Sequence, residues 1–375
     1  MNAPPAILQV LPALVTGGVE RGTIEIAEAQ IAAGFRAIVA SAGGPMVAEL
    51  ERLGARHVAL PLDRKSPVAL WRNAGRLAAL ARAEGVAILH ARSRGPAWSA
   101  WLAARRTGAR FVTTYHGSYN ENFPGKRAYN AVMAKGDRVI AISHFIAGLI
   151  AERHGTPAAR IRIIPRGVDP RRFDPALVTP ARIAALRAAW GLPDGRPVIL
   201  LPGRVTRWKG QGVLVEAMGR LPGDALAVLV GGQGSKQDFV AELQARAAAL
   251  GLGDRLRLAG HADDMAAALL LADVVVHAST DAEAFGRTVI EAQAMARPVI
   301  ASDLGGPRET VAEGVTGWRV PPGDAAALAA ALARVLAMPA EARAAIGAAA
   351  RQAVLEHYST RAMQDATIAV YRELL

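Results

Sequence analysis

The chain has 375 residues, no cysteine and a net charge of +12. Its length exceeds what one ordinary hydrophobic core supports, so two domains are expected, and the lack of cysteine excludes disulfides and thiolate metal sites. Residues 1–174 hold 24 Lys and Arg against 12 Asp and Glu, whereas the remaining residues hold 20 of each sign. The basic excess therefore lies in the first half and favours an anionic partner there, such as phospholipid, an acidic acceptor or nucleic acid; an arginine-rich genome is the alternative explanation.

The N-terminal residues do not resemble an export signal. MNAPPAILQVLPAL has no positively charged segment before its apolar residues. No apolar run reaches the roughly 20 residues that span a bilayer. We therefore expect a soluble cytoplasmic protein, with peripheral contact to the inner face of the cytoplasmic membrane through its basic half.

In the first half, short apolar runs alternate with amphipathic stretches, which predicts repeated β-α units. Strands are expected at Ile7–Leu11, Ala37–Ala40, His57–Leu60, Ala87–His90, Phe111–Tyr115, Val139–Ile142 and Ile161–Pro165. Helices are expected at Glu20–Ala33, Val68–Glu84, Pro96–Thr107 and Ser143–His154. This alternation implies a parallel sheet with helices on both faces.

A second β-α series follows RGVDPRRFDP, whose Pro, Arg and Asp residues mark a domain junction. Its strands are expected at Val198–Leu201, Ala227–Val230, Arg255–Leu258, Val274–Ala278 and Val299–Ala301. Its helices are expected at Gly210–Arg220, Lys236–Leu250, Met265–Leu271, Arg287–Ala296 and Ala325–Leu336, with a helical tail throughout Glu341–Leu375. The sequence thus predicts an α/β protein with two doubly wound, Rossmann-like domains, residues 1–174 and 175–357. Ligands of such sheets bind at the carboxyl ends of the strands.

Three loops at strand ends stand out in the first half. Gly17 and Gly18 let backbone N–H groups approach a phosphate or a sugar, although a glycine pair is equally a plain turn. Arg92 and Arg94 follow the fourth strand and can clamp a carboxylate or phosphate, unless they are solvated surface arginines. His116 follows the fifth strand, where it either orients a substrate hydroxyl or is a structural histidine.

The loops of the second half carry cations and glycines. Gly203 ends a strand, and Arg204 and Lys209 bracket the following turn; two cations at such a corner suit a diphosphate. Gly232 belongs to a glycine-rich turn after the next strand. No G-x-G-x-x-G, Walker A or D-x-D pattern occurs. These absences argue against a dinucleotide oxidoreductase, a P-loop protein and a carboxylate-held metal ion.

The stretch TDAEAFGRTVIEAQAMARP, residues 280–298, joins two apolar strands through an acidic turn and a helix. Glu283 lies in the turn and Glu291 about two helical turns in. Carboxylates at such a corner can accept hydrogen bonds from a polyhydroxylated ligand, and free N–H groups at the helix start attract anions. The alternative is that Glu283 compensates the helix dipole and Glu291 is solvated.

In combination and in this order, these loops resemble the retaining glycosyltransferases of family 4, which have the GT-B fold. The most specific part is EAFGRTVIE, residues 283–291, which is similar to the E-x7-E element of that family. TGGVERGTIEIAEA together with HARSRGPAWSAW is similar to enzymes of bacterial lipopolysaccharide assembly. Two positions depart from the family pattern, Ala284 in the acidic corner and Arg166 at the junction.

The resemblance implies a role for each position that matches. Glu291 would hold the ribose hydroxyls of a nucleotide, and Arg204 and Lys209 would grip its diphosphate. Gly18 would approach the diphosphate from the first domain, and the helix at 358–375 would pack back on that domain. The remaining matches would contact the transferred sugar or the donor: His116, Glu283, Phe285, Gly286, Arg287, Thr288, Gly17, Gly203 and Gly232.

The expected function is therefore sugar transfer from a nucleotide diphosphate sugar to a lipid-linked or oligosaccharide acceptor in cell-envelope polysaccharide synthesis. The C-terminal domain would hold the donor and the N-terminal domain the acceptor, with Arg92 and Arg94 as acceptor contacts. No cofactor and no tightly bound metal ion are expected. An epimerase or phosphorylase of the same fold is the nearer alternative, and a basic nucleic-acid-binding protein is the more distant one.

Overall fold

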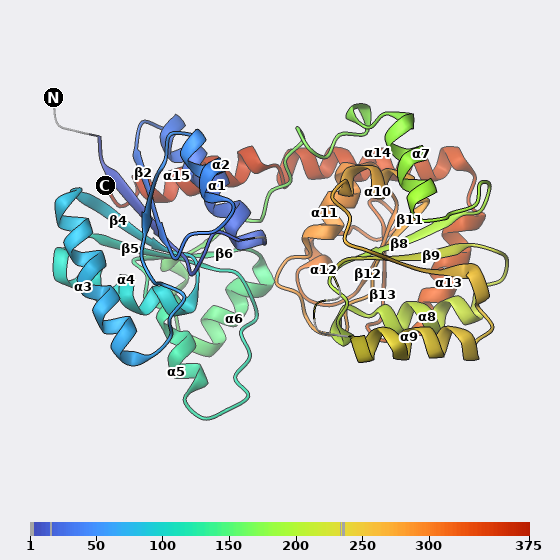
Figure 1. Ribbon diagram of the computed structural model, residues 1–375, viewed down its shortest axis with the longest axis horizontal. Coiled ribbons are helices and arrows are strands. Elements are labelled where there is room, and N and C mark those ends of the chain that lie inside the picture. Colours follow the sequence, from blue (N-terminus) through green and yellow to red (C-terminus); the bar gives the residue numbers. More distant parts are fainter. Residues whose placement is uncertain (1–3, 16, 233, 235–236) are drawn as a thin grey trace. The chain divides into compact units, whose positions relative to one another are not determined.

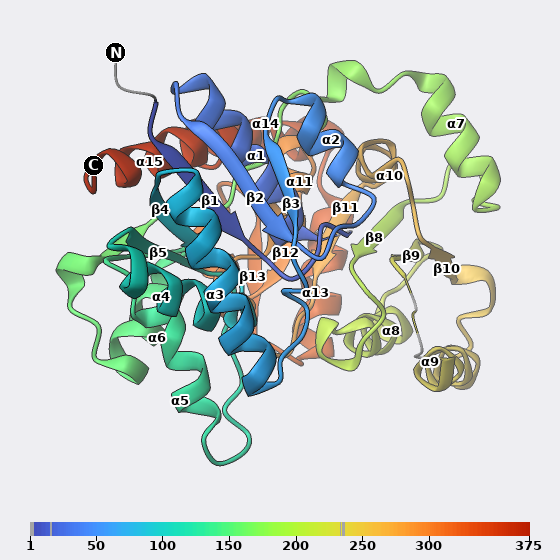
Figure 2. The same ribbon diagram turned by 60° about the vertical axis from the view of Figure 1, so that its left-hand side comes forward.

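The computed structural model describes residues 4–15, 17–232, 234 and 237–375. The chain divides into two compact units: the N-terminal part up to Pro165 with Arg361–Leu375, and Arg166–Thr360. Each unit is a sheet with helices on its two faces (Figures 1 and 2). Residues 166–174, which we expected in the first domain, belong to the second unit.

The sheet of the first unit has seven parallel strands in the order β3-β2-β1-β4-β5-β6-β7. Reversal of the strand order beside β1 is the mark of a doubly wound sheet. The strands are β1 Ala6–Val10, β2 Arg36–Ser41, β3 Arg56–Ala59, β4 Val86–Ala91, β5 Arg110–Tyr115, β6 Arg138–Ala141 and β7 Ile161–Ile163. All seven predicted strands are present.

The sheet of the second unit has six parallel strands in the order β10-β9-β8-β11-β12-β13, which repeats the same winding pattern. The strands are β8 Val198–Pro202, β9 Leu226–Val230, β10 Leu256–Gly260, β11 Val274–His277, β12 Val299–Ser302 and β13 Trp318–Val320. The prediction of two doubly wound α/β domains is confirmed. The strands predicted from the sequence did not include β13, whose three residues are too few to give a recognisable pattern.

The helices of the first unit are α1 Gly18–Ala32, α2 Val47–Arg52, α3 Pro67–Ala83, α4 Arg94–Thr107, α5 Lys126–Asn130 and α6 His144–His154. Those of the second unit are α7 Pro180–Ala189, α8 Gln211–Arg220, α9 Gln237–Ala249, α10 Met265–Leu271, α11 Arg287–Ala294, α12 Pro307–Thr310, α13 Ala325–Ala337 and α14 Ala340–His357. The predicted start of α9 at Lys236 lies outside the described residues. Four helices, α2, α5, α7 and α12, are not among those predicted from the sequence. Three of these are six residues or shorter, and α7 buries no residue fully, so its apolar pattern is weak.

The helical tail is not continuous, contrary to the prediction. It ends at His357 and resumes as α15, Thr360–Arg372. Between the two helices, the Val168 N–H donates to the Tyr358 carbonyl at 2.8 Å, and the Thr360 N–H donates to the Val168 carbonyl at 2.9 Å. The chain breaks here because an extended segment supplies the hydrogen bonds that a helix would otherwise make internally.

α15 belongs to the core of the first unit. Met363, Ile368 and Tyr371 pack with strand residues such as Ile88 and Val112. The buried Tyr371 hydroxyl lies 2.6 Å from Nδ1 of the buried His90. Burial, and secondarily the charge of Arg92, holds the pKa of His90 well below its ordinary value.

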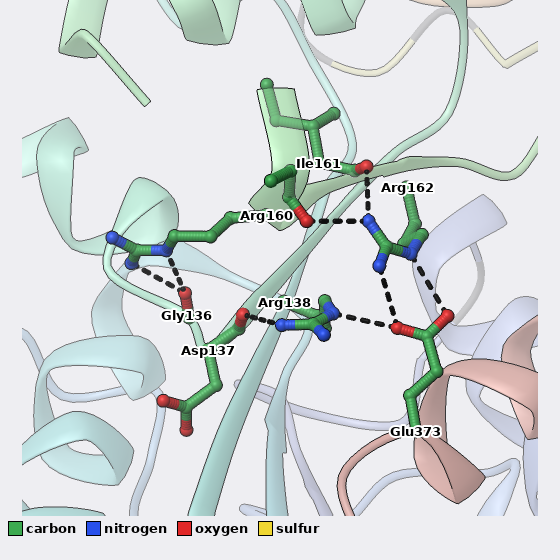
Figure 3. Close-up of polar contacts among 8 residues, drawn as sticks. Gly136, Asp137, Arg138, Arg160, Ile161, Arg162 and Glu373 are labelled. Atoms are coloured by element: carbon green, nitrogen blue, oxygen red, sulfur yellow. Dashed lines mark hydrogen bonds and ion pairs between the residues drawn. The ribbon is translucent and has the colours of Figure 1, made fainter. Parts of the chain in front are cut away.

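The end of α15 is held to the sheet by a surface ion-pair cluster (Figure 3). Glu373 accepts hydrogen bonds from Arg138 Nε at 2.8 Å and from Arg162 Nε at 3.0 Å. Arg138 belongs to β6 and Arg162 to β7. The hydrogen bonds from Arg162 and Arg138 lower the pKa of Glu373.

Within the described part of the chain, no single helix is both long and apolar enough to span a bilayer. α13 and α14 together satisfy that criterion by length and composition, but they are bent by 111° relative to one another.

Candidate functional site

The loop after β8 is held against the end of β11 by two backbone features. Gly210 has a φ of 76°, and a Cβ on it would clash with the carbonyl oxygen of Ala278, so only glycine fits this close approach. The Thr280 N–H donates to the carbonyl oxygen of Trp208 at 2.8 Å. These contacts place Lys209 beside the acidic turn that follows β11.

Glu283 is the centre of a mostly buried polar cluster. Its Oε1 atom accepts hydrogen bonds from Lys209 Nζ and from Ser279 Oγ, the latter at 2.9 Å, and His277 Nε2 lies 3.0 Å from the same oxygen. The side chains of Glu283 and Lys209 are only 13% and 14% exposed. All three contacts are made to Oε1, one of the two carboxylate oxygens.

The charge of Glu283 is fixed by these neighbours. Burial by itself raises the pKa of a carboxyl group. Here the charges and hydrogen bonds of His277 and Lys209 outweigh burial and hold the pKa of Glu283 well below its usual range. The group is therefore a stably ionised acceptor of hydrogen bonds and not a proton donor.

α11 begins directly after the acidic turn. Gly286 precedes it with a φ of 83°, and no side chain caps the helix start. The first N–H groups therefore lack intrahelical acceptors and can bind an anion. Buried Phe285 packs edge-on against Tyr358, with ring centroids 5.7 Å apart, which fixes the turn. Glu291 pairs with Arg287 one turn earlier, at 3.2 Å.

The glycine-rich turn after β9 lies beside the loop after β8. The Gly203 N–H donates to the carbonyl oxygen of Val230 at 2.8 Å, and the Val205 N–H donates to that of Gly232 at 3.1 Å. Arg204 is exposed between these bonds. Because β9, β8 and β11 are neighbours, the structure gathers the predicted second-unit residues at one edge of the sheet. These are Gly203, Arg204, Lys209, Gly232, Glu283, Phe285, Gly286, Arg287, Thr288 and Glu291.

Sequence reasoning missed His277 and Ser279, both buried in this cluster. The sequence predicts His277 as part of an apolar strand, Val274–Ala278. A polar residue at the carboxyl end of a buried parallel strand was the signal that could have found it. Among the described residues, no three His, Asp or Glu side chains gather as ligands for a metal ion.

The predicted residues of the first unit lie at the carboxyl edge of its sheet. Gly17 precedes α1, and Gly18 is its first residue; no side chain caps this helix start. His116 is half-buried after β5, and a backbone hydrogen bond joins it to Tyr119. Burial raises the pKa of Tyr119 to about 12, against the opposing effects of that hydrogen bond and of Arg94.

Arg92 is buried, which contradicts the alternative that it is a solvated surface arginine. Its side chain is only 3% exposed, and Tyr371 and Glu25 are the groups that act electrostatically on it. Burial lowers the pKa of Arg92, opposed by Tyr371 and then Glu25. Glu25 belongs to α1 and Tyr371 to α15, so both helices contribute a group that acts on the charge of Arg92.

Arg94 is half-buried and lines a pocket of about 600 Å³, which we call the α4 pocket. Its charged and aromatic lining residues are Asp63, Lys65, Arg94, Phe123, Lys126 and Tyr129. Arg94 donates to Asn130 Oδ1 at 2.9 Å and stacks on Tyr119. Lys126 Nζ lies 4.6 Å from the ring centroid of Phe123. The pocket thus combines three cations, one carboxylate and two aromatic rings at the carboxyl edge of the sheet.

Two Rossmann-like units, each with its polar residues at the carboxyl edge of a parallel sheet, define the GT-B class of glycosyltransferase folds. A glycosyltransferase from Rickettsia africae has the same fold with a TM-score of 0.92 and 37% identity, over 100% of this chain and 99% of that one. The Anabaena protein HepE, solved with UDP and glucose, matches with a TM-score of 0.85 and 25% identity over 99% of this chain and 100% of that one.

The sequence patterns of two families match successive parts of the chain. The one described as Glycosyltransferase Family 4 matches residues 16–172, and the one described as Glycosyl transferases group 1 matches residues 183–353. The chain belongs to glycosyltransferase family 4. D-inositol 3-phosphate glycosyltransferase from Xylanimonas cellulosilytica is 34% identical over 63% of this chain and 60% of that protein. The chain spans less than two thirds of the length of this relative.

Proposed function

We propose that the protein transfers a sugar from a nucleotide diphosphate sugar to an acceptor hydroxyl, with retention of the anomeric configuration. The observation that carries the proposal is the cluster of Lys209, Glu283 and His277 beside the uncapped start of α11. A cation and free N–H groups suit a diphosphate, and an ionised carboxylate suits sugar hydroxyls. The UDP and glucose bound by HepE support a nucleotide-sugar donor.

Each donor group has a partner in this proposal. Arg204 and Lys209 neutralise the diphosphate together with the N–H groups of residues 285–288. Glu291 accepts hydrogen bonds from the ribose, and Oε2 of Glu283 accepts one from the transferred sugar. His116, Gly17 and Gly18 remain predicted donor contacts from the first unit. This charge on the protein takes the place of a metal ion or other cofactor.

In the reaction, the bond between sugar C1 and the phosphate oxygen breaks, and a bond from C1 to the acceptor oxygen forms on the same face. The acceptor proton passes to the leaving phosphate oxygen. Negative charge grows on that oxygen, so Lys209 and Arg204 stabilise the transition state more than the ground state. Glu283 is a poor nucleophile because Lys209 and Ser279 hydrogen-bond one of its two oxygens and its pKa is low. A front-face reaction is therefore favoured over a glycosyl-enzyme intermediate.

The acceptor binds the first unit, with Arg94 and Lys65 in the α4 pocket as its contacts. Three cations against one carboxylate favour an acceptor that carries negative charge, and the Xylanimonas relative named for inositol 3-phosphate is in keeping with this. The basic excess of residues 1–174 favours a lipid-linked or glycan acceptor at an anionic membrane. We therefore propose that the enzyme acts at the inner face of the cytoplasmic membrane, in cell-envelope polysaccharide or lipopolysaccharide synthesis.

A thermal-shift panel of UDP, GDP and ADP with their sugar conjugates tests the donor half of the proposal. One nucleotide should stabilise the full chain by about 2.7 kcal/mol at a hundredfold its dissociation constant. Liposome flotation tests the membrane half, because vesicles with anionic lipid should carry the protein and neutral vesicles should not. No stabilisation by any donor contradicts the transfer, and flotation that ignores lipid charge contradicts the membrane contact.

A further inference from the structure

A second basic pocket borders the α4 pocket. It has a volume of about 600 Å³, and we call it the α6 pocket because Arg153 and His154 end that helix. Arg127 and Lys135 complete its charged lining, so three arginine or lysine side chains and no carboxylate face the cavity. Gly125 lines both pockets. The two cavities are therefore neighbours on one surface of the first unit.

The cations of the α6 pocket are held in place but poorly neutralised. Arg127 Nε donates to the Arg153 carbonyl oxygen at 2.8 Å, which holds the Arg127 side chain against the end of α6. Arg153 donates to the Tyr119 carbonyl oxygen and lies 4.0 Å from Glu121. Lys135 Nζ lies 5.0 Å from the ring centroid of Trp101 and, among the described residues, has no carboxylate within 4 Å. Like charges gathered in this way repel one another, so an anion in the pocket would be stabilised.

The distribution of lysines separates these pockets from the general basic bias. The chain has only five lysines among its 44 basic residues, so its bias is an arginine bias. The first unit contains three of the five, Lys65, Lys126 and Lys135, and all three line these two pockets. A lysine ammonium is a point charge that suits a single oxyanion, whereas arginine suits planar bidentate pairing. Composition alone does not explain why the lysines gather here.

We infer that the α6 pocket is a second anion subsite, so that the acceptor is an extended saccharide with at least two anionic groups, phosphates or carboxylates. One group occupies the α4 pocket and the next occupies the α6 pocket. This inference rests on the proposed function and names the substrate class of its acceptor. A single-stranded nucleic acid would also carry repeated charges, but two separate cavities suit discrete groups better than a uniform backbone.

Binding of charge-matched probes tests the inference by titration calorimetry. Galacturonate and glucose 6-phosphate carry one anionic group, whereas trigalacturonate and glucose 1,6-bisphosphate carry more. The wild-type chain should bind the multivalent probe of at least one pair about tenfold or more tightly than its monovalent partner, and the pair that responds identifies carboxylate or phosphate. Equal affinity within both pairs overturns the inference.

Lys135→Gln should weaken the multivalent probe about fivefold, the upper range for one exposed ion pair, and leave the monovalent probe unchanged. Lys135→Arg should restore binding. Arg110→Gln is the matched control, because it removes one charge from the exposed start of β5 and should change neither affinity. If Lys135→Gln behaves like Arg110→Gln, or if a single-stranded oligonucleotide binds as tightly as trigalacturonate and glucose 1,6-bisphosphate, the second subsite is refuted.

His154 provides a readout of occupancy inside the pocket. Burial is the largest cause of its lowered pKa; Glu121 raises it, and Arg127 and Arg153 lower it further. Its Nε2 lies 3.3 Å from the Tyr115 hydroxyl. A bound anion offsets the two arginines, so the multivalent probe should raise the pKa of His154 in an NMR titration and the monovalent probe should not. UDP binding should be the same in all variants. If the wild type does not bind UDP, the proposed donor is contradicted, but the result with the anionic probes can still be interpreted.

Discussion

In the second unit, the central cation of the candidate site is already paired. Lys209 contacts Glu283, which is held in turn by Ser279 and His277. In the first unit, Lys65 and Lys126 line a pocket and form no ion pair with any described residue. The first arrangement keeps charges in fixed positions before a ligand arrives, which is how an active site stabilises a transition state at little reorganisation cost. The second arrangement leaves charge to be neutralised by the ligand, which suits recognition of an anionic acceptor.

The largest effect is expected on kcat when Lys209 is removed. Lys209→Ala removes the cation that we propose stabilises the leaving phosphate, so kcat should fall at least a hundredfold, or about 3 kcal/mol of barrier. Arg207→Ala is the matched control. It removes a cation two residues earlier that pairs with Glu242 at the surface, and it should change kcat less than threefold. Near-normal turnover of Lys209→Ala in a steady-state assay would refute its role.

Glu283→Gln tests the pairing of Lys209 with Glu283 through the free energy of unfolding. It leaves Lys209 largely buried without its counter-charge, and we expect a loss of about 3 kcal/mol in the free energy of unfolding at pH 7. Because the folded-state pKa is lowered, the stabilisation is fully present above the free value of 4.5 and declines as the pH falls below it. Urea unfolding at several pH values should therefore show the difference between variant and wild type narrowing only in acid. A difference that is constant down to pH 3 would contradict the assigned ionisation.

Arg94→Gln tests whether the α4 pocket binds an anionic acceptor. It should raise the KM for an anionic acceptor about tenfold, which corresponds to about 1.4 kcal/mol, with little change in donor KM or in kcat. Raised salt should weaken acceptor binding to the wild type more than to the variant. A change in donor KM instead of acceptor KM would place Arg94 in the donor site.

The smallest effect is expected on stability, when an ion pair at the surface of the first unit is removed. Glu373→Gln breaks the contacts with Arg138 and Arg162 shown in Figure 3, and should cost about 1 kcal/mol or less because these groups are solvated. Thermal unfolding should show this small loss, with glycosyl transfer unchanged. A larger loss would mean that the surface cluster, and not the buried face around Tyr371, holds α15 to the sheet.

Much of the fold could be predicted from the sequence because buried parallel strands are continuous apolar runs. β8 and β11 are such runs, and the rule that ligands meet the carboxyl ends of strands selected the loops of Lys209 and Glu283. Elements that bury little or contain few residues, such as α7 and β13, carry no pattern of comparable strength.

The direction in which each side chain of the site points could not be predicted from the sequence. Arg92 and Arg94 are two residues apart after one strand, yet Arg92 is buried, where Tyr371 and Glu25 act on its charge, while Arg94 lines the α4 pocket. Tertiary packing decides which way each guanidinium turns. His277 was missed for the related reason that a strand end and a strand interior look alike when every neighbour is apolar.

Titration calorimetry of the full chain with UDP-glucose and GDP-mannose, in the wild type and in Lys209→Ala, tests the central claim most directly. The account predicts that the wild type binds one of these donors and that Lys209→Ala binds it at least tenfold more weakly, while Arg207→Ala binds it normally. Equal affinity of Lys209→Ala and wild type for the donor that binds would contradict the claim that this strand-end corner of the second unit holds a nucleotide diphosphate sugar.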